Sequence, residues 1–449
     1  MKQSVRIGSG AGYAGDRWEP AVELAERGDV DYLAFECLAE RTIAREQLAM
    51  RQNPDRGYNP LLQDRFSAVL PACRANGVRI VTNMGAANPR GAAREVAAIA
   101  RDQGGMPIRI AALLGDDVGA TVAKMPQLRL METGEPLESL LPRMASANAY
   151  LGADAIVLAL QTGADVVITG RVADPSLFLA PMLHELGWAY DDYARLAQGT
   201  AAGHLLECAG QITGGYFADP GKKEVPGLAR LGFPFADIGS DGEVTIGKVE
   251  GSGGRIDIMT CSEQLLYELH DPTSYITPDC VLDVSQLSFA AAGADRVRVS
   301  GAKARPRTDS YKVSVGYLDG FIGEGQISYG GINAVARARL AGQVVRERLT
   351  LRGYRFDDLR VELIGLESLH GPGEGRPEPY EVRLRVAGRT RDRKAAQVLG
   401  EEVETLLTNG PAGGAGDFKQ VREILAVQSV LLPRHLVQPS VDMIEVMSR

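Results

Sequence analysis

The chain of 449 residues is predicted to form an α/β domain with a mainly parallel, doubly wound sheet, followed by a smaller α+β domain of ferredoxin-like type. Up to about residue 210, strand, loop and helix patterns alternate, which is typical of a parallel sheet covered by helices. From about residue 311 the order becomes β-α-β-β-α-β, which is typical of a ferredoxin-like unit. An α/β barrel is the alternative for the first part. Because the chain is too long for one hydrophobic core, we expect two domains, residues 1–299 and 300–449.

The first strand, residues 5–8, leads into a loop that contains Gly10, Gly12 and Gly15. Glycine is needed where a ligand lies against bare main chain, and the N-terminus of the next helix attracts anions. The spacing matches the dinucleotide fingerprint G-x-G-x-x-G, but Pro20 favours the first helical turn, so the loop is longer than a dinucleotide turn. We therefore expect the loop to face a ligand of another kind. A nicotinamide or flavin nucleotide, and a turn without a ligand, are the alternatives.

Four more apolar segments are predicted as strands of the same sheet, and polar residues gather where each strand ends. Ligands bind at the carboxyl ends of the strands in open α/β sheets and in α/β barrels alike. The expected strands are residues 31–36, 78–82, 108–114 and 165–169, and the expected helices are residues 39–50, 61–76, 91–101 and 142–161. The ligand-binding residues predicted at the strand ends are Ser9, Gly10, Gly12, Asp16, Arg17, Asn83, Asn88, Arg171 and Asp174.

Three residues are candidates for proton transfer. Glu36 closes an apolar strand, where burial can raise a carboxyl pKa, and the alternative role is a helix cap. Asp116 follows the fourth strand beside a second aspartate; adjacent side chains on extended backbone diverge, which argues against a metal pair. His204 shares a helix face with Glu207 and Cys208, which suits an acid/base pair or a Cys–His pair. A packed helix with a satisfied histidine is the alternative for His204.

After residue 210 the chain becomes rich in loops, with strands expected at residues 243–249 and 255–259. The spacing G-x-x-x-x-G-K at residues 242–248 is followed by valine inside a strand pattern, so we reject a phosphate-binding loop. The basic link at residues 300–309 suits the phosphates of coenzyme A, with a solvated loop as the alternative. The later strands are expected at residues 311–317, 359–365, 380–388 and 427–432, and the later helices at residues 333–349 and 394–407.

Composition narrows the class of protein. A net charge of −8 argues against nucleic acid or an anionic membrane as the partner. No apolar run reaches the roughly 18 residues of a membrane span, and the start lacks a signal-peptide pattern. The five cysteines are scattered without C-x-x-C, and the histidines lack ligand spacing, so we expect neither disulfides nor a metal site. These features are typical of a cytoplasmic protein.

Several strings of the chain resemble the acyclic terpene utilisation (AtuA-like) family. They include YLAFECLAERT, TNMGAANPR, TGRVAD, GHLLECAGQITGG, GYLDGFIGEG and TNGPAGG, together with the glycine loop of residues 5–17. The resemblance implies a role in the bacterial breakdown of citronellol- and geraniol-type terpenes through coenzyme A thioesters, or in branched dicarboxylic acid metabolism. Many members carry a further small ferredoxin-like domain, so a separate subunit of that kind is an expected partner. The family supplies no agreed catalytic residues.

Together these observations predict a cytoplasmic catabolic enzyme of lyase or hydratase type, acting on a branched carboxylic acid or its coenzyme A thioester. The glycine loop and Arg17 or Arg171 would hold a carboxylate or phosphate, and Glu36, Asp116 or His204 would move the proton. One alternative is a non-catalytic acyl-CoA-binding subunit of a carboxylase assembly, and another is a nucleotide-dependent oxidoreductase. We expect a homo-oligomer, and no cofactor is assigned beyond coenzyme A as part of the substrate.

Overall fold

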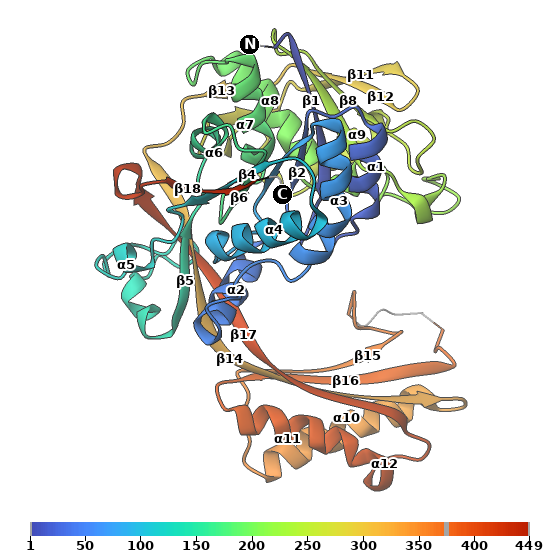
Figure 1. Cartoon of the computed structure of the whole chain (residues 1–449). Helices are drawn as coiled ribbons and strands as arrows, with labels where there is room; N and C mark the ends of the chain where they lie inside the picture. Colours follow the sequence, from blue (N-terminus) through green and yellow to red (C-terminus); the bar gives the residue numbers. More distant parts are fainter. Residues whose placement is uncertain (1, 372–376, 448–449) are drawn as a thin grey trace. The chain divides into compact units, whose positions relative to one another are not determined.

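The computed structural model describes residues 2–371 and 377–447, which form two compact units (Figure 1). The first unit contains the described parts of residues 1–316 and 427–449, and the second contains those of residues 317–426. The units differ from the expected domains because the chain returns to the first unit after residue 426. There its last strand, β18 (Ser440–Val446), pairs with β4 (Ile108–Leu114).

The first unit is built on a ten-stranded mixed sheet in the order β11-β12-β8-β7-β1-β2-β3-β6-β4-β18. Five adjacent strands of this sheet pair with one another in parallel, as predicted. They are β1 (Ser4–Ala11), β2 (Tyr32–Phe35), β3 (Arg79–Thr82), β6 (Val166–Thr169) and β4. Because the sheet has two free ends, it is open, and no closed barrel occurs among the described residues.

Antiparallel strands extend the sheet on both sides, so the sheet as a whole is mixed and the predicted parallel arrangement holds only for its five strands from β1 to β4 in the sheet order. They come from loop-rich or C-terminal sequence in which the alternation of strand and helix is lost. These strands are β7 (Pro234–Gly239), β8 (Val244–Lys248), β11 (Ser288–Gly293), β12 (Arg296–Ser300) and β18. A small separate sheet in the order β13-β10-β9 comprises β9 (Tyr275–Ile276), β10 (Val281–Asp283) and β13 (Lys303–Arg305).

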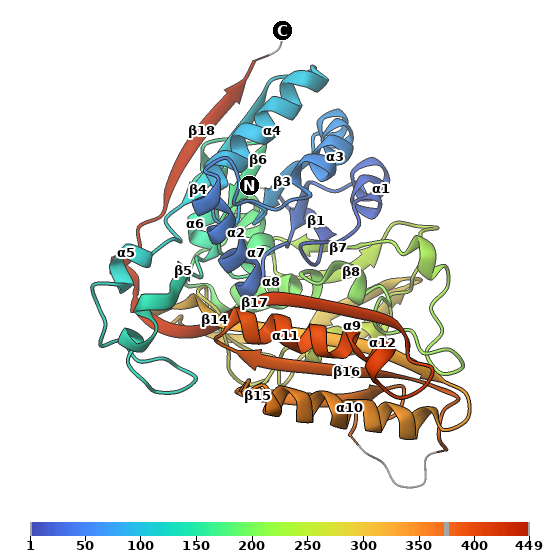
Figure 2. The ribbon, with the colours of Figure 1, turned by 90° about the horizontal axis from the view of Figure 1, so that it is seen from below.

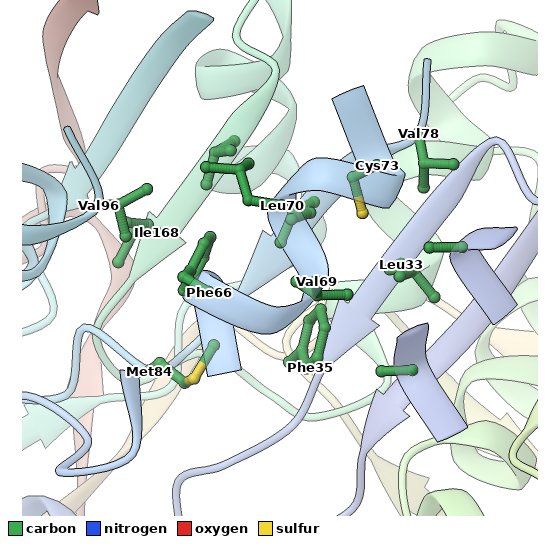
Figure 3. Close-up of a cluster of buried hydrophobic side chains, with 14 of the residues drawn as sticks. Leu33, Phe35, Phe66, Val69, Leu70, Cys73, Val78, Met84, Val96 and Ile168 are labelled. Carbon is green, nitrogen blue, oxygen red and sulfur yellow. The ribbon is translucent and has the colours of Figure 1, made fainter. Parts of the chain in front are cut away.

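Helices of the first unit pack in two groups. One group contains α1 (Glu19–Arg27), α3 (Leu62–Asn76) and α4 (Pro89–Gln103), and the other contains α6 (Ala153–Gln161), α7 (Ser176–Leu186) and α8 (Tyr193–Leu206). Figure 3 shows side chains of α3 and α4 meeting those of β2 and the later strands in a buried apolar cluster. This core fixes the strand ends that carry the site. The doubly wound arrangement itself stays a prediction.

Two predicted elements were wrong. Residues 142–161, expected as one helix, form β5 (Met144–Ala149) and then α6, because β5 pairs with β14 (Ser310–Gly330) and this pairing overrides the helix propensity of alanine. Residues 255–259, expected as a strand, lead into α9 (Ile258–Leu266). The side chain of Asp257 accepts hydrogen bonds from two backbone N–H groups of α9 in a capping box, which starts a helix.

The second unit has the element order β-α-β-β-α-β and the sheet order β15-β16-β14-β17. Its elements are β14, α10 (Ala334–Leu351), β15 (Asp358–Ile364), β16 (Glu381–Thr390), α11 (Arg393–Glu404), α12 (Leu406–Asn409) and β17 (Ala415–Pro433). Both long helices pack on β16, and Figure 2 shows α10 and α11 alongside these strands. The order agrees with the predicted pattern, and the ferredoxin-like class stays a prediction.

The remaining elements are short or lie at the edge of the first unit. They are α2 (Glu40–Gln52), α5 (Gly119–Val122) and 3-10 helices at Leu137–Ser139, Leu141–Arg143, Ala209–Gln211, Leu228–Arg230 and Arg434–Leu436. None of the helices in the described ranges combines the length and the apolar character that a membrane crossing requires.

Candidate functional site

A cavity of about 980 Å³ lies in the first unit, bordered by the segments that follow the carboxyl ends of β1, β2 and β6. Its volume is at the upper end of the roughly 300–1,000 Å³ that is usual for ligand pockets. One part of its wall is apolar, and another carries several charged side chains. The apolar part includes Met131, Leu228, Leu231, Phe233, Tyr267, Tyr275, Ile276 and Leu431. The charged part includes Arg17, Glu36, Glu40, Arg171, Asp174, Glu207, Glu268 and Lys312.

Arg171 organises the charged wall. Its side chain is 1% exposed. The guanidinium donates hydrogen bonds to the carbonyl oxygen of Val172 at 2.8 Å, to that of Leu38, and to the carboxylate of Asp174. The ring of Tyr150 lies 4.5 Å from the guanidinium carbon, which adds a cation–π contact. With these partners Arg171 is held in place by the protein itself.

Asp116 supports this arrangement from behind. Its Oδ2 accepts hydrogen bonds from the backbone N–H of Arg171 at 2.8 Å and from Asn148 at 2.9 Å. Burial raises the pKa of Asp116 to about 6, although both hydrogen bonds act in the opposite direction. Asp116 does not border the cavity. It therefore acts on the site through the position of Arg171.

Glu36 is the carboxyl at the end of β2, and it is 9% exposed. Its Oε1 accepts hydrogen bonds from the backbone N–H of Leu38 at 2.7 Å and from Asn83 at 3.0 Å. Burial raises the pKa of Glu36, and this effect outweighs the opposing charge of Arg171 and the two hydrogen bonds. Glu36 thus holds its proton to higher pH than a free glutamic acid, as a general acid must.

Two further carboxyls face opposite environments. Burial raises the pKa of Asp174 well above its usual value despite the charge of Arg171, and the nearby acidic groups Glu36 and Glu207 add to the rise. The pKa of Glu40 is lowered: burial raises it, but the hydrogen bond from Tyr150 and the charge of Arg171 prevail. One wall therefore carries both proton-holding and ionised carboxyls, a pattern that supports acid/base chemistry.

His204 and Glu207 form a buried pair at the end of α8. The Nδ1 of His204 lies 2.8 Å from the Oε1 of Glu207, and Nε2 donates a hydrogen bond to the carbonyl oxygen of Leu265 at 3.1 Å. Glu207 borders the cavity and His204 does not. Both ring nitrogens are engaged, and burial raises the pKa of the Cys208 thiol. The hypothesis of a Cys–His pair is therefore not supported by the geometry.

Six of the predicted residues border the cavity: Gly12, Asp16, Arg17, Glu36, Arg171 and Asp174. Asn83 lies behind Glu36, as Asp116 lies behind Arg171 and His204 behind Glu207. Asn88 does not border the cavity, and its side chain accepts a hydrogen bond from the backbone N–H of Gly91 at the start of α4. Ser9 and Gly10 lie within β1 rather than in the loop, because this strand is longer than predicted.

The glycines of the first loop are explained by contacts inside the protein. A Cβ atom on Gly12 would collide with the backbone of Cys208, and one on Gly10 would collide with the ring of Phe35. A Cβ on Gly15 would meet only the ring of Tyr13. The backbone N–H of Gly12 donates a hydrogen bond to Asp16 at 2.9 Å, which closes the loop. Gly10 and Gly12 thus allow close packing without a nucleotide.

Several residues of the wall were missed by the sequence analysis, namely Glu40, Tyr150, Glu268, Tyr275 and Lys312. Glu40 follows Glu36 closely, so the segment after β2 was a usable signal. The others come from segments far apart in the chain, and no local pattern marks them. The basic residues Lys303, Arg305 and Arg307 do not border the cavity, and Arg307 pairs with Asp154 at 2.7 Å.

In residues 2–371 and 377–447, no group of three or more histidine, cysteine, aspartate or glutamate side chains is placed to hold a metal ion. A family model described as acyclic terpene utilisation family protein AtuA matches residues 5–443 of the chain. No curated protein and no solved structure matches the chain.

Proposed function

Since this chain belongs to the acyclic terpene utilisation family AtuA, which implies a role in acyclic terpene utilisation, we propose that it is a catabolic enzyme of lyase or hydratase type. Its proposed substrate is a branched, terpene-derived carboxylic acid or the coenzyme A thioester of such an acid. The observation that carries this proposal is the cluster of carboxyls around Arg171, beside an apolar wall in one cavity.

The charged wall supports addition or removal of water next to a carboxyl or thioester group. Such a reaction needs an acid that protonates the leaving hydroxyl and a base that takes a proton from carbon. Glu36, whose pKa is raised by burial, suits the acid. The apolar side chains of the wall suit a branched hydrocarbon chain. Several of them, such as Met131, Ile276 and Leu431, are about half exposed, and each CH₂ group that a ligand buries against them would contribute about 0.8 kcal/mol.

Arg17 and Lys312 are the proposed partners of the anionic end of the substrate. Both border the cavity, and their side chains are about half exposed. Arg171, which was also expected in this role, already donates to Val172, Leu38 and Asp174. We therefore assign Arg171 to positioning the carboxyls.

The direct test offers the protein an α,β-unsaturated coenzyme A thioester of a branched terpenoid acid in heavy-oxygen water. Mass spectrometry then reports uptake of one labelled water molecule. Glu36→Gln should lower turnover by roughly 10² to 10⁴ with little change in ligand affinity.

Glu46→Gln is the matched control, because Glu46 is 4% exposed but lies outside the cavity wall, paired with Arg45. It should leave turnover unchanged. A Glu36→Gln protein that works at the wild-type rate would remove Glu36 from the mechanism. Tight binding of the ester without turnover in the wild type would instead favour the non-catalytic acyl-CoA-binding subunit.

A further inference from the structure

The pair of His204 and Glu207 has a fixed arrangement of protons. A carbonyl oxygen can only accept a hydrogen bond, so Nε2 of His204, 3.1 Å from the oxygen of Leu265, carries a hydrogen. Nδ1 and the Oε1 of Glu207 are 2.8 Å apart and must share a further proton. The pair is therefore either imidazolium with carboxylate or neutral imidazole with carboxylic acid.

Glu207 has one oxygen left over. Oε2 is buried and has no hydrogen-bond partner among the described residues. An unpaired buried polar atom usually costs about 1–3 kcal/mol, so its persistence calls for an explanation. Glu207 borders the cavity, whereas His204, at 1% exposure, is covered. Oε2 is thus the atom of this pair that remains for a ligand.

Other elements hold the pair in place and set its electrostatics. The ring of Tyr275 lies 5.3 Å from the ring of His204, in a tilted arrangement. The charged and titratable groups that act on Glu207 or His204 from the neighbouring segments are Glu36, Arg171, Asp174, Cys208, Glu268 and Tyr275. Glu207 is therefore enclosed by the same charged wall as Glu36.

We propose that Glu207 is the base that takes a proton from carbon in the proposed reaction, and that His204 is a positioning residue that stores the displaced proton. This assignment rests on the proposed function. When the pair starts as neutral imidazole with carboxylic acid, Oε2 accepts the proton from carbon while the proton at Oε1 moves to Nδ1. When it starts as imidazolium with carboxylate, Oε2 accepts the proton directly, so both routes end as carboxylic acid with imidazolium. The C–H electron pair forms the double bond, and the hydroxyl leaves as water with the proton of Glu36. Return of a proton from the Glu207–His204 pair to Glu36 through solvent completes the cycle.

Deuterium exchange separates this step from the loss of water. The probe is a saturated branched acyl-CoA, which offers an exchangeable proton beside the thioester but no leaving hydroxyl. In heavy water the wild-type protein should exchange this proton, as measured by mass spectrometry. Glu207→Gln should lower the exchange rate by at least about 100-fold, whereas Glu36→Gln should keep exchange while losing hydration.

A readout for His204 comes from the pH profile. His204→Asn removes the group that takes up the displaced proton and that lowers the pKa of Glu207. Because Glu207 stays in its buried site, it should then lose its proton only at higher pH, and exchange should require higher pH as well. In the wild type, ¹⁵N NMR of histidine-labelled protein should show hydrogen on Nε2 of His204, and Glu207→Gln should leave its imidazole neutral. If Glu207→Gln fails to fold, Glu207→Asp replaces it and should also slow exchange.

The outcomes are distinguishable. Exchange at the wild-type rate in Glu207→Gln, together with lost hydration in Glu36→Gln, would overturn this assignment and leave the proposed function standing. A wild-type protein that binds the esters but neither exchanges nor hydrates them would overturn both.

Discussion

At the scale of single residues, the site depends on the buried guanidinium of Arg171 and on the carboxyls around it. Arg171 lies among Glu36, Glu40 and Asp174, and its buried charge is balanced by carboxyls that differ in protonation. Arg171 is 1% exposed, whereas the side chains of Asp174 and Glu40 are 34% and 40% exposed, so water screens part of their interaction with the guanidinium. Asp116 accepts a hydrogen bond from the backbone N–H of Arg171, and its raised pKa makes the stability of this arrangement depend on pH.

Asp116→Asn tests that coupling. The pKa of Asp116 in the folded protein is raised from about 3.8 to about 6, so protonation favours the folded state. This stabilising contribution is complete below about pH 4 and is lost as the pH rises through 6. Relative to the Asn variant, which imitates the protonated carboxyl, the wild type should lose up to about 3 kcal/mol of unfolding free energy between pH 4 and 7. Urea denaturation at several pH values measures this difference, and a difference that stays flat would contradict the prediction.

At the scale of elements, the glycines near the end of β1 allow the chain to pack closely against neighbouring segments. Gly12→Ala should lower the free energy of unfolding by about 1–3 kcal/mol, because its Cβ would collide with the backbone of Cys208, which cannot rotate away. Gly15→Ala is the control and should change stability by less, since the ring of Tyr13 can move. Thermal and urea denaturation check both variants. Equal stability of the two variants would refute the packing explanation.

The same elements show how far sequence reasoning reaches. Buried parallel strands such as β2 and β4 have continuous apolar sequence bounded by turns, so their positions and common edge were predictable. The alanine-rich segment of β5 carries helix propensity that its pairing with β14 overrides. The capping box at Asp257 begins a helix where β-branched and apolar residues suggested a strand. Local sequence patterns therefore mispredict an element when pairing with a distant strand, or one capping residue, determines its structure.

The candidate site likewise contains residues that the sequence predicts and residues that only the folded structure reveals. Arg171 and Glu36 follow strands of the parallel part of the sheet, and the rule that ligands bind at strand ends predicts that such residues share one cavity. The sequence makes His204 a candidate through its chemistry, but only the folded chain shows that Glu207, and not His204, borders the cavity. Lys312 and Tyr150 reach the wall through pairing of segments far apart in sequence. No spacing rule contains that information.

At the scale of the whole molecule, the chain leaves the first unit after residue 316 and comes back at residue 427. Its last strand, β18, covers the edge of β4 with an antiparallel ladder from Ser440 to Val446. A chain cut after Pro439 should leave this edge open. An open, apolar strand edge pairs with other chains, so we expect lower stability and concentration-dependent association.

Light scattering and thermal denaturation of the shortened protein check this expectation. As a control, the full chain carrying Arg360→Ala should behave like the wild type, because Arg360 is an exposed residue of β15 in the other unit, paired with Asp358. A shortened protein that stays monodisperse with an unchanged melting temperature would contradict the role given to β18.

The late arrival of β18 also matters during biosynthesis. About 330 residues separate the end of β4 from the start of β18. At translation rates of roughly 5–20 residues per second, the nascent chain exposes the β4 edge for about 15 to 65 seconds. Leu431, part of the cavity wall, is also made more than 300 residues after the end of β4. The cavity wall is therefore incomplete until residue 431 has been made, and a chaperone that shields the open edge of β4 would raise the yield of folded protein.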